Sequence, residues 1–584
     1  MEKEITTTYI WQKYEKGIDY INKINLTAKT DKCHRMYNGD QWHGLKSGGE
    51  ELPILNIIKG IVKYKVSTVA QNTMSAVYTP IGKRTEDAVK ACEALNTHFQ
   101  IMWERAKMDK HSWSIIKDAC IGADGYIYFG EADVTQAQLI NNVNVLLGDE
   151  QNANLQQQPY IMLVERLFVR DIRKEAERNG LSQEEIEMII PDENVNNQLG
   201  DKTEVDYSVE DGKCTSILYM YKDDKGFVHF AKSTQSVIYK PDEPVVAKLS
   251  DGTPSSVGLT MYPIVNYVWE DTKGSARGCG DVEHLIANQI ELNKTLARRA
   301  IAIKQCAFPK IAYLESAVTN PEQIDVVGAK IGVKDANAQN IQNLISYLNP
   351  SAVSPDARNF TDELISLTKE LAGAGDAATG QIDPTQASGT AIIATRDQAA
   401  LPLNEQVARY RQFVEDVAVL WYDIWKAYNP DGLTLESKDE MGNETLEVIP
   451  AAVLDKMMVN VRIDVSQNNP FSKYAQEQAI MNLFTSQAIT FEEMVEALDN
   501  DSVAPKGKLQ DIIDKRGEKD KMKNALVQAM QQMEQQQVII DQLQGQQGDV
   551  EKSNQVLGEA LGQIKQQEEI INQLGGMPNE MQGM

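Results

Sequence analysis

The chain has 584 residues, more than a single hydrophobic core usually serves, so several structural regions are expected. Hydrophobic residues make up 42% and charged residues 24%, which excludes a wholly disordered protein. The 84 acidic side chains outnumber the 58 basic ones and give a formal net charge of −26. Such a surface repels phosphate on average, which argues against a conventional high-affinity DNA-binding protein but suits one that lets nucleic acid pass without retaining it.

The sequence contains no stretch close to the roughly 18 uncharged apolar residues of a membrane helix. Met1–Glu4 does not open a secretion signal, so we expect synthesis in a cytoplasm and no membrane association. The cysteines are scattered and form no C-x-x-C pair, which predicts reduced and mostly buried thiols. They are Cys33, Cys92, Cys120, Cys214, Cys279 and Cys306.

Helical spacing in the first part of the chain marks Tyr9–Ile24, and residues 85–118 fit a helix or a helix pair. A turn is expected at Met36–Trp42. The apolar stretch Leu52–Ile61 is followed by a helical pattern as far as Val77. The Gln- and Asn-rich residues 133–159 are expected to form an exposed insertion. The predicted strands are Gly125–Phe129, Tyr160–Val169 and an antiparallel group of Ile217–Tyr221, Phe227–Ala231 and Ser236–Tyr239, with a hairpin turn at Asp223–Gly226.

Residues 281–305 contain no Gly or Pro and predict a helix of about 37 Å at about 1.5 Å per residue. Apolar side chains cover about half of its circumference, so it should pack against more than one neighbour, either within one subunit or between copies of the chain. The apolar set is Val282, Leu285, Ile286, Ile290, Leu292, Leu296, Ala297, Ile301 and Ile303. The polar set is His284, Asn288, Glu291, Lys294, Arg298 and Arg299.

Residues 306–353 read as short strands and turns, and a second helix is predicted at 356–372 with one narrow apolar stripe of Phe360, Leu364, Leu367 and Leu371. The small and polar residues 373–389 form a long loop, a type that is usually functional. A helix should follow over Ala391–Tyr428, with a kink or break at Pro402. After it, one seam repeats at three and four residues: Val407, Tyr410, Val414, Val417, Trp421, Ile424 and Tyr428.

Two strands are predicted at Glu444–Ile449 and Val459–Val465, followed by a helical pattern over Pro470–Leu498. From Met522 the chain becomes Gln-rich, with heptads that change frame near Gly545 and Gly548. This extension predicts a weak coiled coil that assembles within an oligomer rather than alone.

The sequence carries none of the common signatures of catalysis. The sequence has no P-loop, no G-x-S-x-G elbow and no H-E-x-x-H, and Glu283 stands where a dinucleotide fingerprint beginning at Gly278 would need its third glycine. None of the six histidines lies near a cysteine at zinc-finger spacing. No enzymatic activity, cofactor or metal is therefore expected.

The order of the segments is more specific than any single motif. Tyr37–Trp42, followed by Leu52–Lys59 and Val69–Ser75, resembles the N-terminal signature of tailed-bacteriophage portal proteins, and Phe168–Ser182 resembles a segment of that family's wing region. The succession of helix, strand-rich insertion, helix, Gly-rich loop and kinked helix is similar to the family's stem, clip, stem, tunnel loop and wing helix. The resemblance covers roughly residues 30–520.

The resemblance implies an α+β portal-type subunit with a mixed wing, two stem helices, a strand-rich clip, a kinked helix, a helical crown and a C-terminal extension. The implied boundaries are wing 1–280, first stem helix 281–305, clip 306–353, second stem helix 354–372, tunnel loop 373–390, kinked helix and wing return strands 391–468, crown 469–521 and Gln-rich extension 522–584.

The implied function is a ring, usually of twelve subunits, at the single capsid vertex of the virion through which double-stranded DNA enters and leaves. The implied partners are that DNA, the terminase large subunit, the head–tail adaptor, and the major capsid and scaffolding proteins. DNA would pass the tunnel-loop residues Asp376, Thr379, Gln381, Asp383, Thr385, Gln386 and Ser388. Subunits would meet at the stem residues Ile286, Ile290, Leu292, Leu296, Ile301, Phe360, Leu364 and Leu367.

Two other classes stay open at this point. One is another virion structural protein, such as a scaffolding or tail-attachment subunit, which the Gln-rich C-terminal part favours. The other is an unrecognised nucleic-acid-processing enzyme. Electron-microscope images of the purified protein separate rings from rods, and nuclease and ATPase assays test for an enzyme.

Overall fold

The structure is a computed structural model of the chain, which divides into two compact units, residues 1–467 and 468–584. Nearly all of the described residues belong to the first unit. They are 5–46, 52–81, 85–130, 134–193, 211–248, 254–307, 310–324, 326–334, 345–348, 355–375, 401–438, 444–450 and 459–467, together with isolated positions elsewhere.

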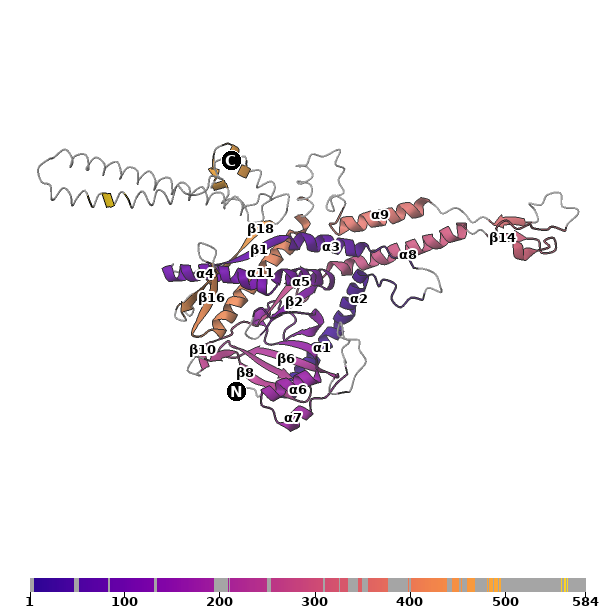
Figure 1. Cartoon of the computed structure of the whole chain (residues 1–584). Coiled ribbons are helices and arrows are strands. Elements are labelled where there is room, and N and C mark those ends of the chain that lie inside the picture. The colour runs from indigo at the N-terminus through magenta and orange to yellow at the C-terminus, as the bar shows by residue number, and fades with distance from the viewer. Residues whose placement is uncertain are drawn as a thin grey trace, which may run out of the picture. The chain divides into compact units, whose positions relative to one another are not determined.

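Five helices dominate the first part of the chain (Figure 1). Side-chain caps explain where three of them begin, because the oxygens of Thr6, Asn56 and Thr85 accept hydrogen bonds from first-turn backbone N–H groups. Gly39, at φ 99°, ends the second helix in a left-handed conformation that suits glycine. The helices are α1 (Thr7–Lys23), α2 (Leu26–Asn38), α3 (Ile57–Ala70), α4 (Glu86–Arg105) and α5 (Met108–Gly122).

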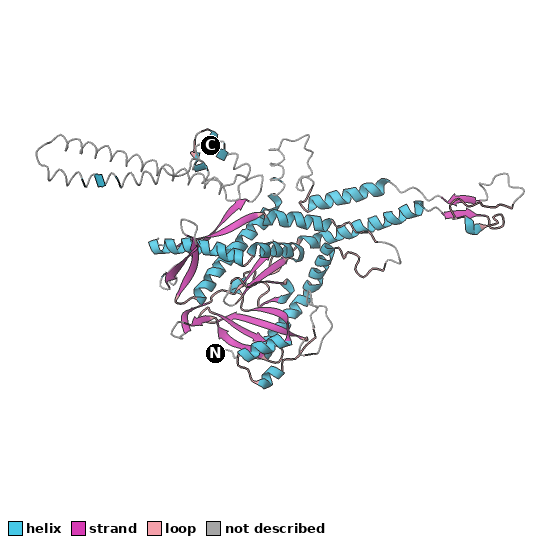
Figure 2. Ribbon diagram, viewed as in Figure 1, coloured by secondary structure: helices cyan, strands magenta, loops and turns pink. Residues whose placement is uncertain are grey.

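Two antiparallel sheets follow (Figure 2). A three-stranded sheet has the order β11–β2–β3, with β2 (Asp124–Phe129) between β3 (Ala137–Ile140) and β11 (Ile264–Val268). The second sheet is a five-stranded meander. The connection between its second and third strands contains α6 (Val169–Arg178) and the short helix α7 (Gln183–Glu187). The strands of the meander, in spatial order, are β4 (Val145–Leu147), β5 (Ile161–Phe168), β6 (Lys213–Lys222), β7 (Val228–Ser233) and β8 (Ile238–Pro244).

Helix α11 (Asn404–Tyr428) lies in the main core. Trp421 is fully buried, with its ring 5.1 Å from that of Phe99, 5.7 Å from Phe129 and 6.0 Å from Trp103 between centroids. The helix starts directly after a 3₁₀ turn (Leu401–Leu403) that contains Pro402, as expected of a proline that ends or begins a helix. The predicted helical part before this turn, residues 391–400, lies almost entirely outside the described residues. The predicted seam is buried at Tyr410, Val414, Val417, Trp421 and Ile424 and half-buried at Val407 and Tyr428.

Distant parts of the chain pair in the remaining strands. β1 (Asn72–Pro80) is antiparallel to β18 (Val459–Gln467), and β16 (Gly432–Lys438) is antiparallel to β17 (Glu444–Pro450). Two short ribbons join β9 (Val246–Lys248) with β10 (Pro254–Gly258), and β12 (Glu270–Asp271) with β13 (Gly278–Cys279).

Two helices of the first unit run side by side, α8 (Asp281–Ala307) and α9 (Pro355–Leu371), with the hairpin strands β14 (Lys310–Tyr313) and β15 (Ile345–Leu348) between them in the chain (Figure 1). The predicted helices at 281–305 and 356–372 are confirmed. The α+β class is confirmed as a mixture of helices and strands.

Three predictions about local structure were wrong. The helix expected to continue to Val77 ends at Ala70, and β1 follows because its pairing with β18 lies almost 400 residues away in the sequence. The expected exposed insertion is instead integral, with Val145 and Leu146 fully buried in β4. The expected turn at Met36–Trp42 begins only at Gly39, since α2 continues to Asn38. The strand β16 was not predicted.

Candidate subunit interface on helices α8 and α9

The start of α8 is fixed by buried ionic groups of the same subunit. The Arg277 guanidinium lies just before the helix, is 4% exposed, and donates hydrogen bonds of 2.9 and 2.8 Å to the Glu150 carboxylate and two more to the carbonyls of Asn142 and Val145. At the first residue of α8, the Asp281 carboxylate accepts a 2.7 Å hydrogen bond from Lys65 Nζ on α3. These contacts hold the helix start against segments more than 120 residues away.

A buried carboxyl group lies beside this anchor. Asp124 Oδ1 accepts a 2.8 Å hydrogen bond from the backbone N–H of Gly278, while Oδ2 is buried without a hydrogen-bond partner among the described residues. Burial raises the pKa of Asp124 to about 6, and the nearby Arg277 charge opposes that rise. The group therefore titrates in the folded protein above the range of an ordinary carboxyl.

The next two turns of α8 are held by buried amide side chains. Gln289 is fully buried: its Nε2 donates to the Leu55 carbonyl at 2.8 Å and its Oε1 accepts from Ile57 N–H at 3.1 Å. Asn293, which is also buried, accepts from Leu55 N–H at 3.3 Å and donates to Gln41 Oε1. The sequence analysis did not single out these two residues, although a polar side chain within an apolar arc is the signal that could have found them.

The segment that these amides hold belongs to the N-terminal signature. Trp42 Nε1 donates to the Pro53 carbonyl at 3.1 Å, and Asn56 Nδ2 donates to the Tyr37 carbonyl at 2.9 Å. The residues that carry the family resemblance near the N-terminus thus build the support of α8.

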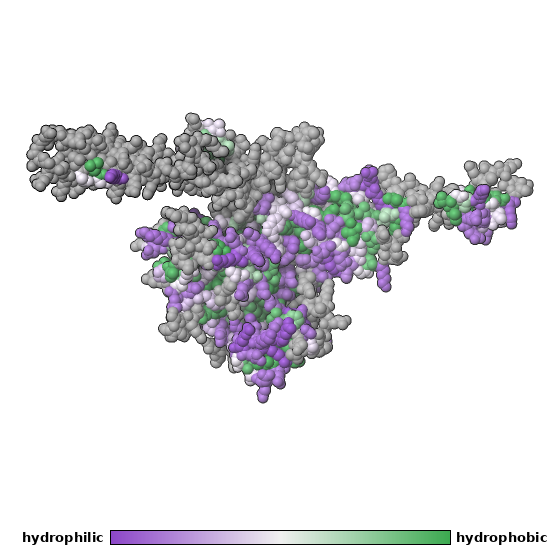
Figure 3. Space-filling model, viewed as in Figure 1, coloured by the Kyte–Doolittle hydropathy of each residue, from purple (hydrophilic) through white to green (hydrophobic). Residues whose placement is uncertain are grey.

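Beyond this support, the apolar arc of α8 is largely exposed. Ile301 and Ile303 are 43% and 53% exposed. Helix α9 covers one side of α8, where Asn288 Nδ2 donates to Thr368 Oγ1 at 3.2 Å and Thr361 and Thr368 are buried. Figure 3 shows hydrophobic surface gathered over this helix pair.

The eight predicted interface residues fall into two groups. Ile286 and Leu292 are buried within the subunit, so they have no surface to offer another copy, and we leave them out of the proposed interface. The other six keep exposed surface. Ile290, Leu296 and Leu364 are half-buried, and Ile301, Phe360 and Leu367 are exposed. The sequence had also placed Leu371 in the stripe of α9, and it is 81% exposed.

The strands between the two helices have little core of their own. Among the described residues of 310–348, only Ala317 and Val318 are buried, while Leu314, Val326 and Val327 are exposed apolar side chains. An isolated bridge joins Val318 to Val333. The exposed apolar surface of this part is thus available for contact with another protein.

The predicted channel residues Asp376, Thr379, Gln381, Asp383, Thr385, Gln386 and Ser388 lie outside the described residues. The described residues that precede them are those at the end of α9. Gly373 adopts φ 66°, and its N–H donates to the Glu370 carbonyl, which closes the helix.

The described residues carry no cluster of three or more side chains that could hold a metal ion, and none of their helices is long and apolar enough to cross a membrane. Of the cysteines with a described side chain, Cys33, Cys92, Cys120 and Cys214 are buried and Cys279 is half-buried. Burial raises the pKa of Cys33 to about 12 and also raises that of Cys120. These two thiols stay protonated, and their burial agrees with the predicted mostly buried thiols.

The exposed apolar face of the helix pair is a surface suited to contact with another protein. The model of the phage P22-like portal protein family matches residues 247–559, more than half of the chain, and this chain belongs to that family. Portal proteins are structural components of phage particles, and the family implies a ring. No curated protein matches. A chain from the virion of a native gene transfer agent particle is similar at 8% identity, with a TM-score of 0.36, over 80% of this chain and 93% of that one. The assignment depends on the family match.

Proposed function

We propose that this chain forms the ring at the unique capsid vertex through which double-stranded DNA is packaged and later ejected. The observation that carries the proposal is the set of apolar side chains on α8 and α9 that one subunit leaves exposed, in a chain of the portal family. An exposed apolar face of this kind is stabilised when another copy covers it. The ring would have twelve subunits and would contact the major capsid and scaffolding proteins.

In this proposal the parts of the chain take the roles that the resemblance implies. Helices α8 and α9 act as the stem, residues 306–353 as the clip and residues 1–280 with β16–β18 as the wing. The net charge of −26 supports a conduit, because duplex DNA carries about one charge per 1.7 Å and strong attraction would stall it.

Imaging of the purified chain tests the ring directly. Negative-stain class averages should show closed rings with a central hole, and native mass spectrometry should give a mass of twelve subunits. Monomers or rods at all concentrations and salt conditions would exclude a ring and favour a scaffolding or attachment subunit. A ring of another subunit number would correct the stoichiometry only.

The clip is the proposed docking site for the terminase large subunit before filling and for the head–tail adaptor afterwards. Deletion of residues 320–334 removes exposed apolar surface and leaves α8 and α9 intact. The ring should form at normal yield while both partners lose binding in pull-down assays. Undiminished terminase binding would place the docking surface elsewhere.

The loop after α9 is proposed to line the channel. It is small, polar or acidic and contains no Lys or Arg between Gly373 and Gly389. Lysine at Asp376 and Asp383 should slow packaging more at low salt than at high salt, because salt screens attraction to phosphate. A packaging defect that does not depend on salt would show that the loop does not line the channel.

A further inference from the structure

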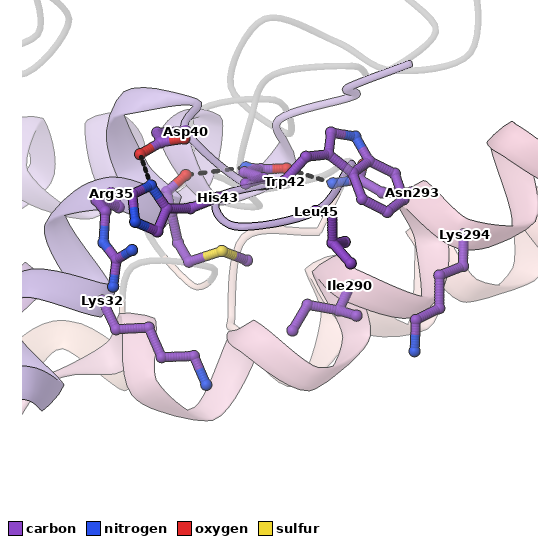
Figure 4. Close-up of a pocket in the computed structure, with 11 residues that line it drawn as sticks. Lys32, Arg35, Asp40, Trp42, His43, Leu45, Ile290, Asn293 and Lys294 are labelled. Atoms are coloured by element: carbon purple, nitrogen blue, oxygen red, sulfur yellow. Dashed lines mark hydrogen bonds and ion pairs between the residues drawn. The ribbon is translucent and has the colours of Figure 1, made fainter. Parts of the chain in front are cut away.

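A pocket of about 250 Å³ lies between α2, the segment that follows it and α8 (Figure 4). Its apolar lining includes Met36, Leu45 and Ile290, and Leu45 is 62% exposed. Lys32 and Lys294 lie on either side of Ile290, and neither has an ion-pair partner in the described part of the chain. The other charged groups of the lining lie beside partners of the same subunit, Arg35 at 2.9 Å from Asp31 and Asp40 at 3.1 Å from His43. The pocket therefore combines an apolar floor with the two lysines at its rim.

This pocket is on the side of α8 that faces away from α9. At about 100° per residue, Ile290 and Lys294 lie roughly 200° and 240° around the helix from Asn288, which contacts Thr368 of α9. The partner helix of the same subunit therefore cannot fill it.

Helix α9 presents a surface of complementary chemistry. Phe360, Leu367 and Leu371 form an exposed apolar stripe at 48%, 48% and 81% exposure. Glu363 and Glu370 flank the stripe, are exposed, and have no cationic partner among the described residues. The α9 surface is thus apolar along its middle and acidic at its edge.

The register of α8 and α9 brings these two surfaces to the same position along the length of the helix pair, which we call their height. The Asn288–Thr368 hydrogen bond sets that register, and the helices are antiparallel. In the arrangement proposed below, the ring axis runs along the pair, so rotation from one copy to the next keeps each residue at the same position along that axis. Leu367 therefore has the height of Gln289–Ile290, and Glu363 has that of Asn293–Lys294.

A second charge pair follows from α2. Lys29 pairs with Glu283 at 3.3 Å, and Lys32 lies about one turn further along α2. Figure 4 shows the Lys32 side chain beside Ile290 on the side opposite Lys294, toward the start of α8. Glu370, two residues beyond Thr368, lies in the same direction along the pair from Leu367.

We propose that the pocket receives α9 of the next copy of this chain, with Leu367 entering beside Ile290, Glu363 on Lys294 and Glu370 on Lys32. The inference rests on the proposed function because it requires a ring. The contact is head-to-tail: every subunit offers a basic pocket on one side and an acidic apolar helix on the other. Apolar burial supplies the affinity, and the charge pairs set partner and orientation.

Charge reversal tests the contact with two variants, Lys32→Glu/Lys294→Glu and Glu363→Lys/Glu370→Lys. All four side chains are exposed, so each variant should keep the wild-type circular dichroism and unfolding midpoint. Each variant alone sets like charges against each other, and its ring yield should fall at least tenfold at low salt. Mixed in equal amounts, the two variants should form rings again, with alternating subunits in a 1:1 ratio by native mass spectrometry. A matched control, Lys110→Glu/Lys225→Glu, makes the same charge change on exposed lysines elsewhere and should assemble normally.

The outcomes separate the inference from the proposed function. Absence of rings from the wild type overturns the proposed function. Wild-type rings together with normal assembly of either variant, or with no rescue on mixing, overturn the inference alone. A second measurement needs no charge reversal: Ile290→Cys and Leu367→Cys variants, mixed under oxidation, should form a disulfide between the two different chains. Disulfides only within one variant would show a two-fold contact and overturn the head-to-tail arrangement.

Discussion

The two halves of α8 have the same apolar periodicity and different surroundings. The first half is held by α2, α3 and the segment around Leu55, through Gln289 and Asn293. The second half, with Ile301 and Ile303, contacts little of its own subunit. The difference shows that the first half is part of the folded core of the subunit. In the proposed ring, the second half and α9 provide the surface for assembly. Variants in the two halves should separate these roles.

The largest effect on the free energy of unfolding is expected for Arg277→Met. Removal of the guanidinium leaves the Glu150 carboxylate and two carbonyls buried without their donors. Breaking a buried pair in this way costs about 3–5 kcal/mol. Urea unfolding of the subunit should show this loss, whereas Lys273→Met, an exposed position of the same connection, should change stability by less than about 0.5 kcal/mol. Equal stability of the two variants would contradict the anchoring role.

The second largest effect is a pH dependence of the free energy of unfolding that comes from Asp124. Because its pKa is raised in the folded state, the folded protein binds this proton more tightly than the unfolded chain does. Stability from this group is present at low pH and is lost as pH rises from about 4, the unfolded value, to about 6. Relative to Asp124→Asn, the wild type should lose about 2–3 kcal/mol across that window, at about 1.4 kcal/mol per pKa unit. Parallel stability curves for the two proteins would exclude the titration.

Asn293→Leu should lower the free energy of unfolding by about 1–3 kcal/mol, since it leaves the buried Gln41 Oε1 without its donor and removes the acceptor of the Leu55 N–H and the Gln289 amide. Leucine has the same branching and the same number of side-chain heavy atoms as asparagine, so no large cavity forms and the loss comes chiefly from the hydrogen bonds. Lys294→Met, one residue further along the helix and exposed, is the matched control for the stability of the subunit. A loss below about 0.5 kcal/mol for Asn293→Leu would show that the amide contacts do not hold α8.

The helices, several strands and the order of segments could be predicted because they depend on local periodicity. β1 could not, since Asn72–Pro80 becomes a strand only by pairing with residues 459–467. The role of residues 133–159 was misjudged because polar composition was taken as exposure, whereas Gln158 is buried and its amide donates to the carbonyls of Asp149 and Asn152. Within the candidate interface, periodicity found the apolar arc but could not tell that Ile286 and Leu292 are covered by their own subunit.

The smallest change in the stability of the subunit is expected for substitutions at the exposed positions Ile301 and Leu371. The same substitutions should prevent assembly of the ring. Ile301 is 43% exposed and Leu371 is 81% exposed, so substitution by Asp removes little buried contact of the subunit and its free energy of unfolding should change by less than about 1 kcal/mol. In the ring the same carboxylate would be buried without a partner, which costs several kcal/mol per ion, and sedimentation should show monomers or open assemblies.

The matched controls are Ile301→Val and Leu371→Met, which keep apolar side chains at both sites and should retain rings. Leu292→Asp provides the opposite comparison, because that side chain is fully buried and the charge should unfold the subunit itself. If Ile301→Asp also unfolded the subunit, the second half of α8 would belong to the folding core, and the division between the two halves would be wrong. If it assembled normally, the subunits would meet through another face of the helix pair.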